Sequence, residues 1–242
     1  MSDALLEVSQ VTKKMGKRKL LNDISFELEK GKIYGFIGPN GAGKTTMMRI
    51  MTGLMQPTSG SVRIASYDVQ TDREKALSKV GAIIESPIFF DYMTGRQVLR
   101  NLSRLHSEIT PSGREIHIEE LLTKVRLETR ADDKVKTYSL GMKQRLGIAQ
   151  SMLGAPELLL LDEPSNGLDP MGMRELRDIV LRLRESSNYA FFISSHLLDE
   201  LQQMCDELIV IKEGTLVWKG PADQLVEDGQ RLEDAFMGLM GL

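Results

Sequence analysis

Residues 32–46 read KIYGFIGPNGAGKTT, a short apolar run followed directly by a loop rich in glycine. The run Lys32–Ile37 predicts a buried strand, and Thr45–Thr52 predicts a helix that stops near Gly53. The loop between them matches the pattern G-x-x-x-x-G-K-[ST], in which backbone N–H groups turn inward around phosphate oxygens. A strand, a phosphate-binding loop and a helix in this order predict an α/β fold with a nucleotide site.

Each polar group of this loop has an expected role. We expect Lys44 to reach the β- and γ-phosphates of a nucleotide as a point charge, and the hydroxyl of Thr45 to bind Mg²⁺. An ordinary glycine-rich turn before a helix is the alternative, but the strand before the loop and the helix after it favour the phosphate site. The other residues of the loop that we expect to contact the nucleotide are Asn40, Gly41, Ala42, Gly43 and Thr46.

A second apolar run ends in two carboxylates. Residues 158–164 read LLLLDEP, and the four leucines predict a buried parallel strand. Ligands in such sheets bind at the carboxyl ends of the strands, where two adjacent acids are costly without a cation. We therefore expect Asp162 to hold Mg²⁺ through water, and Glu163 to act as the general base that activates the attacking water. A solvated turn after a core strand is the alternative, and the phosphate loop upstream disfavours it.

The segments around these motifs differ in character. The chain begins with β-like segments, and helical spacing of Leu, Glu, Arg and Lys dominates residues 85–153. We interpret residues 1–84 and 154–220 as a nucleotide-binding core with an antiparallel β subdomain, 85–153 as an inserted helical subdomain and 221–242 as a C-terminal tail. The other strands are expected at Leu5–Val11, Lys19–Leu28, Ser61–Ile64, Glu157–Leu161, Ala190–Ser194, Leu208–Ile211 and Thr215–Trp218, and helices at Arg96–Leu105, Ile118–Val125, Met142–Leu153 and Met173–Arg184.

The bulk composition excludes several classes of protein. The 242 residues carry a net charge of −3, whereas a general nucleic-acid binder usually has a basic excess, so we expect no nucleic-acid partner. The one cysteine, Cys205, cannot form a disulfide within the chain and is expected to be a small buried apolar residue. No run of 18 apolar residues and no signal peptide is present, so we expect any membrane role to come through a partner.

Three further motifs, in order along the chain, name a family. Residues 138–145 read YSLGMKQR and resemble the LSGGQ signature at the start of a helix. Residues 165–170, SNGLDP, are similar to a D-loop, and residues 194–196, SSH, are similar to a strand end with a switch histidine. With the two motifs above they cover most of the chain, which therefore resembles the ATP-binding subunits of ABC transporters. The resemblance implies a P-loop NTPase core with the β and helical subdomains of the ABC ATPase fold, and ATP with Mg²⁺ as cofactors.

The resemblance also implies how such a subunit works. Two copies would face each other head to tail, so that ATP lies between the phosphate loop of one copy and the signature of the other. Ser139 and the backbone N–H of Gly141 would contact the γ-phosphate across this interface, Asp169 of the D-loop would lie beside it, and His196 would contact the γ-phosphate from its own chain. Hydrolysis would then power integral membrane permease subunits, with the ATPase on the cytoplasmic face of the membrane.

Two departures from the family pattern are informative. Met15 stands where the family usually has an aromatic residue that stacks on adenine, and a thioether packs on a ring less tightly than an aromatic. Glu85, in the segment 80–87 VGAIIESP, stands where the Q-loop usually has glutamine, and we expect its carboxylate to enter the Mg²⁺ shell. The glutamate variant and the SLGMKQR signature resemble the ATPases of bacitracin exporters and lantibiotic-immunity exporters, which implies export of an antimicrobial peptide.

Other functions fit the sequence less well. An exporter ATPase for another drug, a lipid or a polysaccharide is the main alternative. DNA-repair and chromosome ATPases of this superfamily carry long coiled coils between the two nucleotide motifs, and Lys44 and Asp162 are too close in sequence for such an insertion. Relatives that act in translation carry two ATPase domains in one chain, whereas this chain has one. A binding module that has lost catalysis is disfavoured because Lys44, Asp162, Glu163 and His196 are all present.

Overall fold

The phosphate-loop strand lies inside a six-stranded sheet. The structure is a computed structural model that describes residues 4–187, 189–225 and 232–240. The five strands from β9 to β6 run parallel, so their carboxyl ends meet at one edge, while β10 pairs antiparallel with β9. In spatial order the strands are β10 (Thr215–Pro221), β9 (Glu207–Lys212), β3 (Ile33–Ile37), β8 (Ala190–Ser195), β7 (Leu158–Asp162) and β6 (Val80–Ile83).

A smaller antiparallel sheet covers one side of the core. Its order is β2-β1-β4-β5, and the long hairpin of β1 and β2 pairs Met15 with Arg18 beside the turn. A Cβ placed on Gly214, in the β9–β10 turn, would lie 2.5 Å from the carbonyl oxygen of Leu20, so the two sheets meet closely there. The strands of this sheet are β1 (Ala4–Met15), β2 (Arg18–Glu29), β4 (Ser59–Ile64) and β5 (Tyr67–Asp68).

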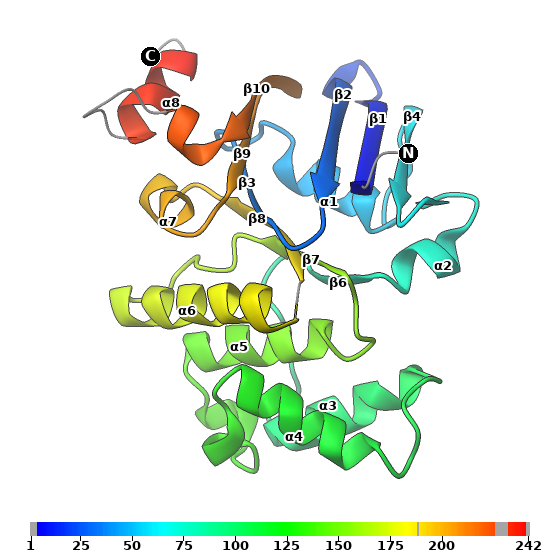
Figure 1. Ribbon diagram of the computed structural model, residues 1–242, viewed down its shortest axis with the longest axis vertical. Coiled ribbons are helices and arrows are strands. Elements are labelled where there is room, and N and C mark those ends of the chain that lie inside the picture. Colours follow the sequence, from blue (N-terminus) through cyan, green and yellow to red (C-terminus); the bar gives the residue numbers. More distant parts are fainter. Residues whose placement is uncertain (1–3, 188, 226–231, 241–242) are drawn as a thin grey trace.

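Helices fill the remaining layers. Helix α1 begins directly after the phosphate loop, whereas α3, α4 and α5 lie between β6 and β7 in the chain and form the end of the molecule away from the small sheet (Figure 1). No helix in the described part of the chain is long and apolar enough to cross a bilayer. The helices are α1 (Lys44–Met51), α2 (Arg73–Leu77), α3 (Gly95–Leu102), α4 (Arg114–Lys124), α5 (Leu140–Ser151), α6 (Pro170–Ser187), α7 (Leu198–Gln202) and α8 (Leu232–Met240), with short 3₁₀ turns at Ser103–Leu105, Glu128–Arg130, Val135–Thr137 and Ala222–Gln224.

The large sheet separates two apolar clusters. Because side chains alternate along a strand, Ile33 and Ile37 of β3 join the cluster that includes α5 and α6. Tyr34 and Phe36 point to the opposite face and join the cluster that includes α1 and the small sheet. Burial of each such side chain stabilises the fold by about 2 kcal/mol. The parallel strands are thus held on both faces, which keeps the loops at their carboxyl ends in a defined place.

Most of the expected elements are confirmed, and the misses have a physical reason. Strand β6 was not expected, because Gly and Ala in VGAI are weak strand formers. A Cβ on Gly81 would lie 2.0 Å from the carbonyl oxygen of Ser151, so this strand needs glycine for its contact with α5. The short elements α2 and β5 were also missed. Cys205 is buried as expected, and burial raises the pKa of its thiol.

Candidate nucleotide site

The loop between β3 and α1 encloses the side chain of its own lysine. Lys44 is 6% exposed, and its Nζ donates to the carbonyl oxygens of Gly38 at 2.7 Å and Pro39 at 3.5 Å. Gly41 and Gly43 have φ values of 80° and 110°, a region that residues with a Cβ rarely adopt. A Cβ on Gly43 would also lie 2.7 Å from Leu21. The two glycines therefore permit the tight turn that brings the lysine back under the loop.

The start of helix α1 is left open for an anion. The first hydrogen bond of the helix runs from the Met47 N–H to the Gly43 carbonyl, so the N–H groups before Met47 have no partner within the helix. No side chain caps this end, and no acidic residue lies in its first turn. A helix N-terminus in this state attracts negative charge through its N–H groups and its dipole.

A cavity opens directly above this helix end. The phosphate loop and the first turn of α1 supply one wall, with Asn40, Gly41, Gly43, Lys44, Thr45 and Thr46. Glu163 lines it from the end of β7, and Arg18 and Leu20 line it from the β1–β2 hairpin. Ala42 is the member of the expected set whose side chain turns into the core, where it is 2% exposed, so it can meet a ligand only through its backbone.

The two carboxylates after β7 are tied together by a serine at the end of β8. Asp162 is 8% exposed, and its Oδ1 accepts a hydrogen bond from Ser194 Oγ at 2.5 Å. The same hydroxyl accepts from the backbone N–H of Glu163 at 2.9 Å. Glu163 has a φ of 47°, a left-handed conformation that costs a non-glycine residue on the order of 1 kcal/mol. The turn is therefore held by the serine, and it directs Glu163 toward the cavity.

The two oxygens of Glu163 face two different side chains. Oε1 lies 3.7 Å from Lys44 Nζ, and Oε2 lies 3.0 Å from Nδ1 of His196. Strand β8 lies between β3 and β7, so His196 emerges between the phosphate loop and the two acids. Because Nδ1 contacts the carboxylate, Nε2 is the ring nitrogen through which His196 can meet a ligand. A carboxylate, an ammonium group and a histidine thus converge on one point at the edge of the cavity.

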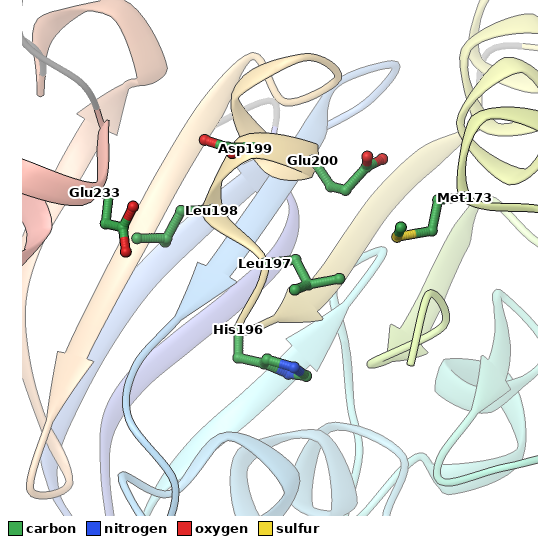
Figure 2. A pocket seen from close by; sticks show the side chains of 7 residues that line it. All are labelled: Met173, His196, Leu197, Leu198, Asp199, Glu200 and Glu233. Atoms are coloured by element: carbon green, nitrogen blue, oxygen red, sulfur yellow. The ribbon is translucent and has the colours of Figure 1, made fainter. Parts of the chain in front are cut away.

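His196 also lines a second cavity, shown in Figure 2, together with Met173 of α6 and the start of α7. Glu200 extends toward Met173, while Asp199 points the other way and Glu233 of α8 closes one side (Figure 2). Glu200 is already engaged, since its Oε2 accepts from Arg177 at 3.3 Å. None of the lysines and arginines in the described part of the chain lines this cavity. The first cavity is therefore the one suited to phosphates.

The signature residues lie outside the first cavity. Ser139 is the N-cap of α5, and its Oγ accepts from the Met142 N–H at 3.2 Å. A Cβ on Gly141 would meet nothing closer than 3.8 Å within its own chain. The backbone at Gly141 is therefore open, and another group can approach it closely. Asp169 accepts from the Gly172 N–H at 2.9 Å and also lies apart from the first cavity.

Two expected ligands lie apart from the cavity lining. Met15 is 57% exposed at the end of β1, and its pairing partner Arg18 lines the cavity instead. The carboxylate of Glu85 forms an ion pair with Arg49 of α1. Glu85 has 63% of its side chain exposed and a φ of 71°. The stacking role of Met15 and the metal role of Glu85 stay predictions.

The donors near the cavity fit a magnesium ion. Thr45 and Asp162 offer oxygen atoms, which Mg²⁺ prefers, and a buried carboxylate with a single side-chain hydrogen bond is well placed to gain a cation. Within the described ranges, no three His, Cys, Asp or Glu side chains gather closely enough to hold a metal. A Mg²⁺ ion would therefore depend on phosphate oxygens and water for most of its shell.

Several residues of the site were not predicted. Arg18 and Leu20 reach the cavity because the β1–β2 hairpin folds against the phosphate loop, and no local pattern announces this contact. Ser194 was noted only as part of a motif. A serine at a strand end is a weak signal, and it did not indicate that the hydroxyl would join Asp162 to the backbone of Glu163. The partner of Glu85, Arg49, lies on α1, and nothing in the local sequence announces an ion pair with a residue so far along the chain.

Comparisons with known proteins agree with this geometry. Residues 21–166 match the family model described as ABC transporter. The ABC transporter ATP-binding protein YdbJ of Bacillus subtilis is 44% identical over 216 residues, which is 89% of this chain and 69% of that protein. The bacitracin transport ATP-binding protein BcrA of Bacillus licheniformis is 39% identical over 91% of this chain and 71% of its own. The lantibiotic transport ATP-binding protein SrtF of Streptococcus pyogenes is 38% identical over 96% of each chain.

Solved structures show the same fold. An ATP-binding subunit of an ABC transporter matches with a TM-score of 0.84 and 28% identity, over 98% of this chain and 99% of that one. The dimeric post-hydrolysis state of the ATP-binding cassette MJ0796, bound to ADP and Pi, matches with a TM-score of 0.78 over 90% of this chain and 98% of its own. Because the identity to this second structure is 23%, the match shows that the two proteins share a fold and nothing further.

Proposed function

Because this chain belongs to the ABC transporter family of ATP-binding proteins, we propose that it powers the export of an antimicrobial peptide of the bacitracin or lantibiotic type. The chain is an ABC-type ATPase, which converts ATP and water to ADP and phosphate. The proposed cargo is supported by BcrA and SrtF, whose names state bacitracin and lantibiotic transport. Export of another drug, a lipid or a polysaccharide is the second candidate, since the name of YdbJ, at 44% identity, states no cargo.

One observation carries the proposed chemistry: Lys44 and His196 approach opposite oxygens of Glu163. With a nucleotide in the cavity, Lys44 would turn from the Gly38 carbonyl to the phosphate oxygens. Glu163 would then accept the proton of the attacking water, a role that typically contributes 10²- to 10⁴-fold to the rate. Nε2 of His196 would hold the γ-phosphate. Mg²⁺, bound through Thr45 and Asp162, would supply charge neutralisation for the phosphates.

A second copy of the chain completes the proposed site. Ser139 and Gly141 lie at the N-terminus of α5 and are absent from the cavity of their own chain, whereas their N–H groups and open backbone suit a phosphate. We place them against the γ-phosphate of the partner copy, with Asp169 beside the interface. ATP would then hold two copies together, and its hydrolysis would release them.

The membrane partner would bind beside Glu85. Ile88, Phe90 and Tyr92 are 93%, 63% and 66% exposed, and the first two line an apolar cavity with Phe89 and Met93. A cluster of exposed apolar side chains is typical of a protein–protein interface. We assign this cavity to a permease subunit, which would hold the ATPase at the cytoplasmic face of the membrane.

The variant Glu163→Gln tests the enzyme mechanism. We expect ATP hydrolysis to fall by about 10²- to 10⁴-fold while ATP binding is retained, because only the proton acceptor is lost. ATP should then trap a dimer, measured by size-exclusion chromatography with light scattering. Adding Ser139→Ala in the same chain should return the protein to a monomer. A Glu163→Gln protein that binds ATP and stays monomeric would contradict the two-copy site.

The cargo is tested in a sensitive bacterial host that expresses the ATPase with its permease subunits. We expect the minimal inhibitory concentration of bacitracin or of nisin to rise with the native chain and to return to the host value with Glu163→Gln. The matched control is Glu120→Gln, which changes an exposed glutamate of α4. Equal susceptibility with the native chain and Glu163→Gln, for both peptides, would reject peptide export and leave the second candidate.

A further inference from the structure

The ion pair of Arg49 with Glu85 joins two segments that are far apart in the sequence. An Nη atom of Arg49, in the last turn of α1, donates to Oε1 of Glu85, just beyond the end of β6. Arg49 has 41% of its side chain exposed and Glu85 has 63%. The left-handed φ of 71° at Glu85 redirects the chain as it leaves the sheet. Both the backbone turn and the arginine therefore determine where this carboxylate lies.

The position of Arg49 on its helix gives the pair a relation to the metal site. Thr45 and Arg49 are four residues apart on α1, so their side chains lie on the same face, with Cβ atoms about 6 Å apart. Thr45 lines the nucleotide cavity. The arginine therefore holds the Glu85 carboxylate about one helical turn away from the residue expected to bind Mg²⁺.

We propose that Arg49 is the positioning residue of Glu85, holding its carboxylate one turn from Thr45 and competing with Mg²⁺ for it. This inference rests on the proposed metal role of Glu85. The guanidinium occupies Oε1 of Glu85 and offsets the negative charge of the whole carboxylate, so the ion pair weakens the attraction of this carboxylate for Mg²⁺. An exposed ion pair contributes only about 0–1 kcal/mol, so binding of Mg²⁺ with a nucleotide can supply enough free energy to break the Arg49–Glu85 pair.

The exchange would carry the nucleotide state toward the membrane partner. Glu85 is followed by Ile88, Phe89 and Phe90, which line the apolar cavity assigned to the permease. Release of Glu85 from Arg49 would move the start of this segment relative to α1. The arginine thus links the helix that follows the phosphate loop to the surface on which transport acts.

The test measures magnesium dependence of nucleotide binding, separately from hydrolysis. The full chain is titrated with MgCl₂ in the presence of a fluorescent, non-hydrolysable ATP analogue. We expect Arg49→Ala to lower the half-saturating Mg²⁺ concentration by about two- to fivefold, the range that an exposed ion pair is worth. Arg49→Lys, which keeps the charge, should stay near the native value. Arg63→Ala, which removes an exposed arginine of β4, is the matched control for net charge and should cause no change.

The variant Glu85→Ala separates the metal role of Glu85 from the role of Arg49, because it removes every side-chain oxygen at this position. If Glu85→Ala leaves the half-saturating Mg²⁺ concentration unchanged, the metal role of Glu85 is wrong and the inference falls with it. If Glu85→Ala raises that concentration but Arg49→Ala does not lower it, only the role of Arg49 is overturned. The same drop for Arg49→Ala in the native and Glu85→Ala backgrounds would also overturn it, because the effect would then come from charge alone.

Discussion

Charged side chains are paired differently at the two ends of the strands of the six-stranded sheet, the amino edge and the carboxyl edge. At the amino ends of the strands, Glu157 pairs with Lys30 at 2.6 Å and with Lys79 at 2.9 Å, and Glu207 pairs with Lys32 at 2.9 Å. At the carboxyl ends, the pairing is incomplete. The buried ammonium of Lys44 donates to backbone carbonyls, and its nearest carboxylate oxygen, on Glu163, lies 3.7 Å away.

We infer from this difference that the paired charges at the amino edge stabilise the fold, whereas the partly paired charges at the carboxyl edge bind a ligand. The two lysines bound to Glu157 lower the pKa of its carboxyl, as expected for a satisfied ion-pair network. Backbone carbonyls hold the ammonium of Lys44 without neutralising its charge, so a phosphate can replace them at small loss. Changes at the amino ends of the strands should therefore affect stability alone, and changes at the carboxyl ends should affect nucleotide binding.

The largest effect is expected for Lys44→Ala. Loss of the ammonium removes its charge-assisted contact with the phosphates, worth about 3 kcal/mol, so ATP affinity should fall by roughly 100-fold. The melting temperature without nucleotide should hold or rise, because the change removes a buried cation whose nearest carboxylate oxygen lies 3.7 Å away. Isothermal titration calorimetry and thermal unfolding measure both. A large drop in melting temperature would show that this lysine stabilises the fold, against the comparison.

An intermediate effect is expected for Ser194→Ala, because Ser194 contributes both to stability and to the position of Glu163. The change leaves the Asp162 carboxylate and the Glu163 N–H without their shared partner, and this should lower the free energy of unfolding by about 1–3 kcal/mol. Hydrolysis should fall as well, because Glu163 loses the bond that holds its turn. Ser195→Ala is the matched control, since its hydroxyl accepts from the Leu197 N–H and, among the described residues, bonds neither acid. Equal losses in both variants would mean that the serine bridge has no special role.

The smallest effect is expected at the amino edge, for Glu157→Gln. An exposed ion pair is worth about 0–1 kcal/mol, so the loss of unfolding free energy at pH 7 should stay near this range, with ATPase activity unchanged. The pKa of Glu157 is lowered in the folded state, so its contribution is present above the ordinary value of 4.5 and is lost as pH falls through the lowered pKa. Urea unfolding at pH 7 and pH 3 should show the difference between variant and native chain shrinking in acid. A changed ATPase rate would contradict the separation of the two edges.

Local chemistry was readable from the sequence because neighbouring residues make it. The strand, the glycine loop and the start of α1 lie within residues 32–46, and the bonds that shape the loop join residues a few positions apart. The N-cap of α5 at Ser139 is equally local, since its hydroxyl bonds the N–H three residues on. Four leucines followed by two acids were enough to predict a buried strand with carboxylates at its end, because the hydrophobic pattern and the strand direction are local properties.

The sequence by itself therefore determined the phosphate loop, the acidic strand end and the helix tip that carries the signature. Only the tertiary structure decided that β8 lies between β3 and β7, which brings Ser194 against Asp162 and the backbone of Glu163, and His196 against the Glu163 carboxylate. It also decided that Arg18 lines the cavity and that Arg49 holds Glu85. The physical reason is that strand order and such contacts depend on the packing of segments far apart in the chain, where many pairings share the same apolar pattern and only the complete core selects one.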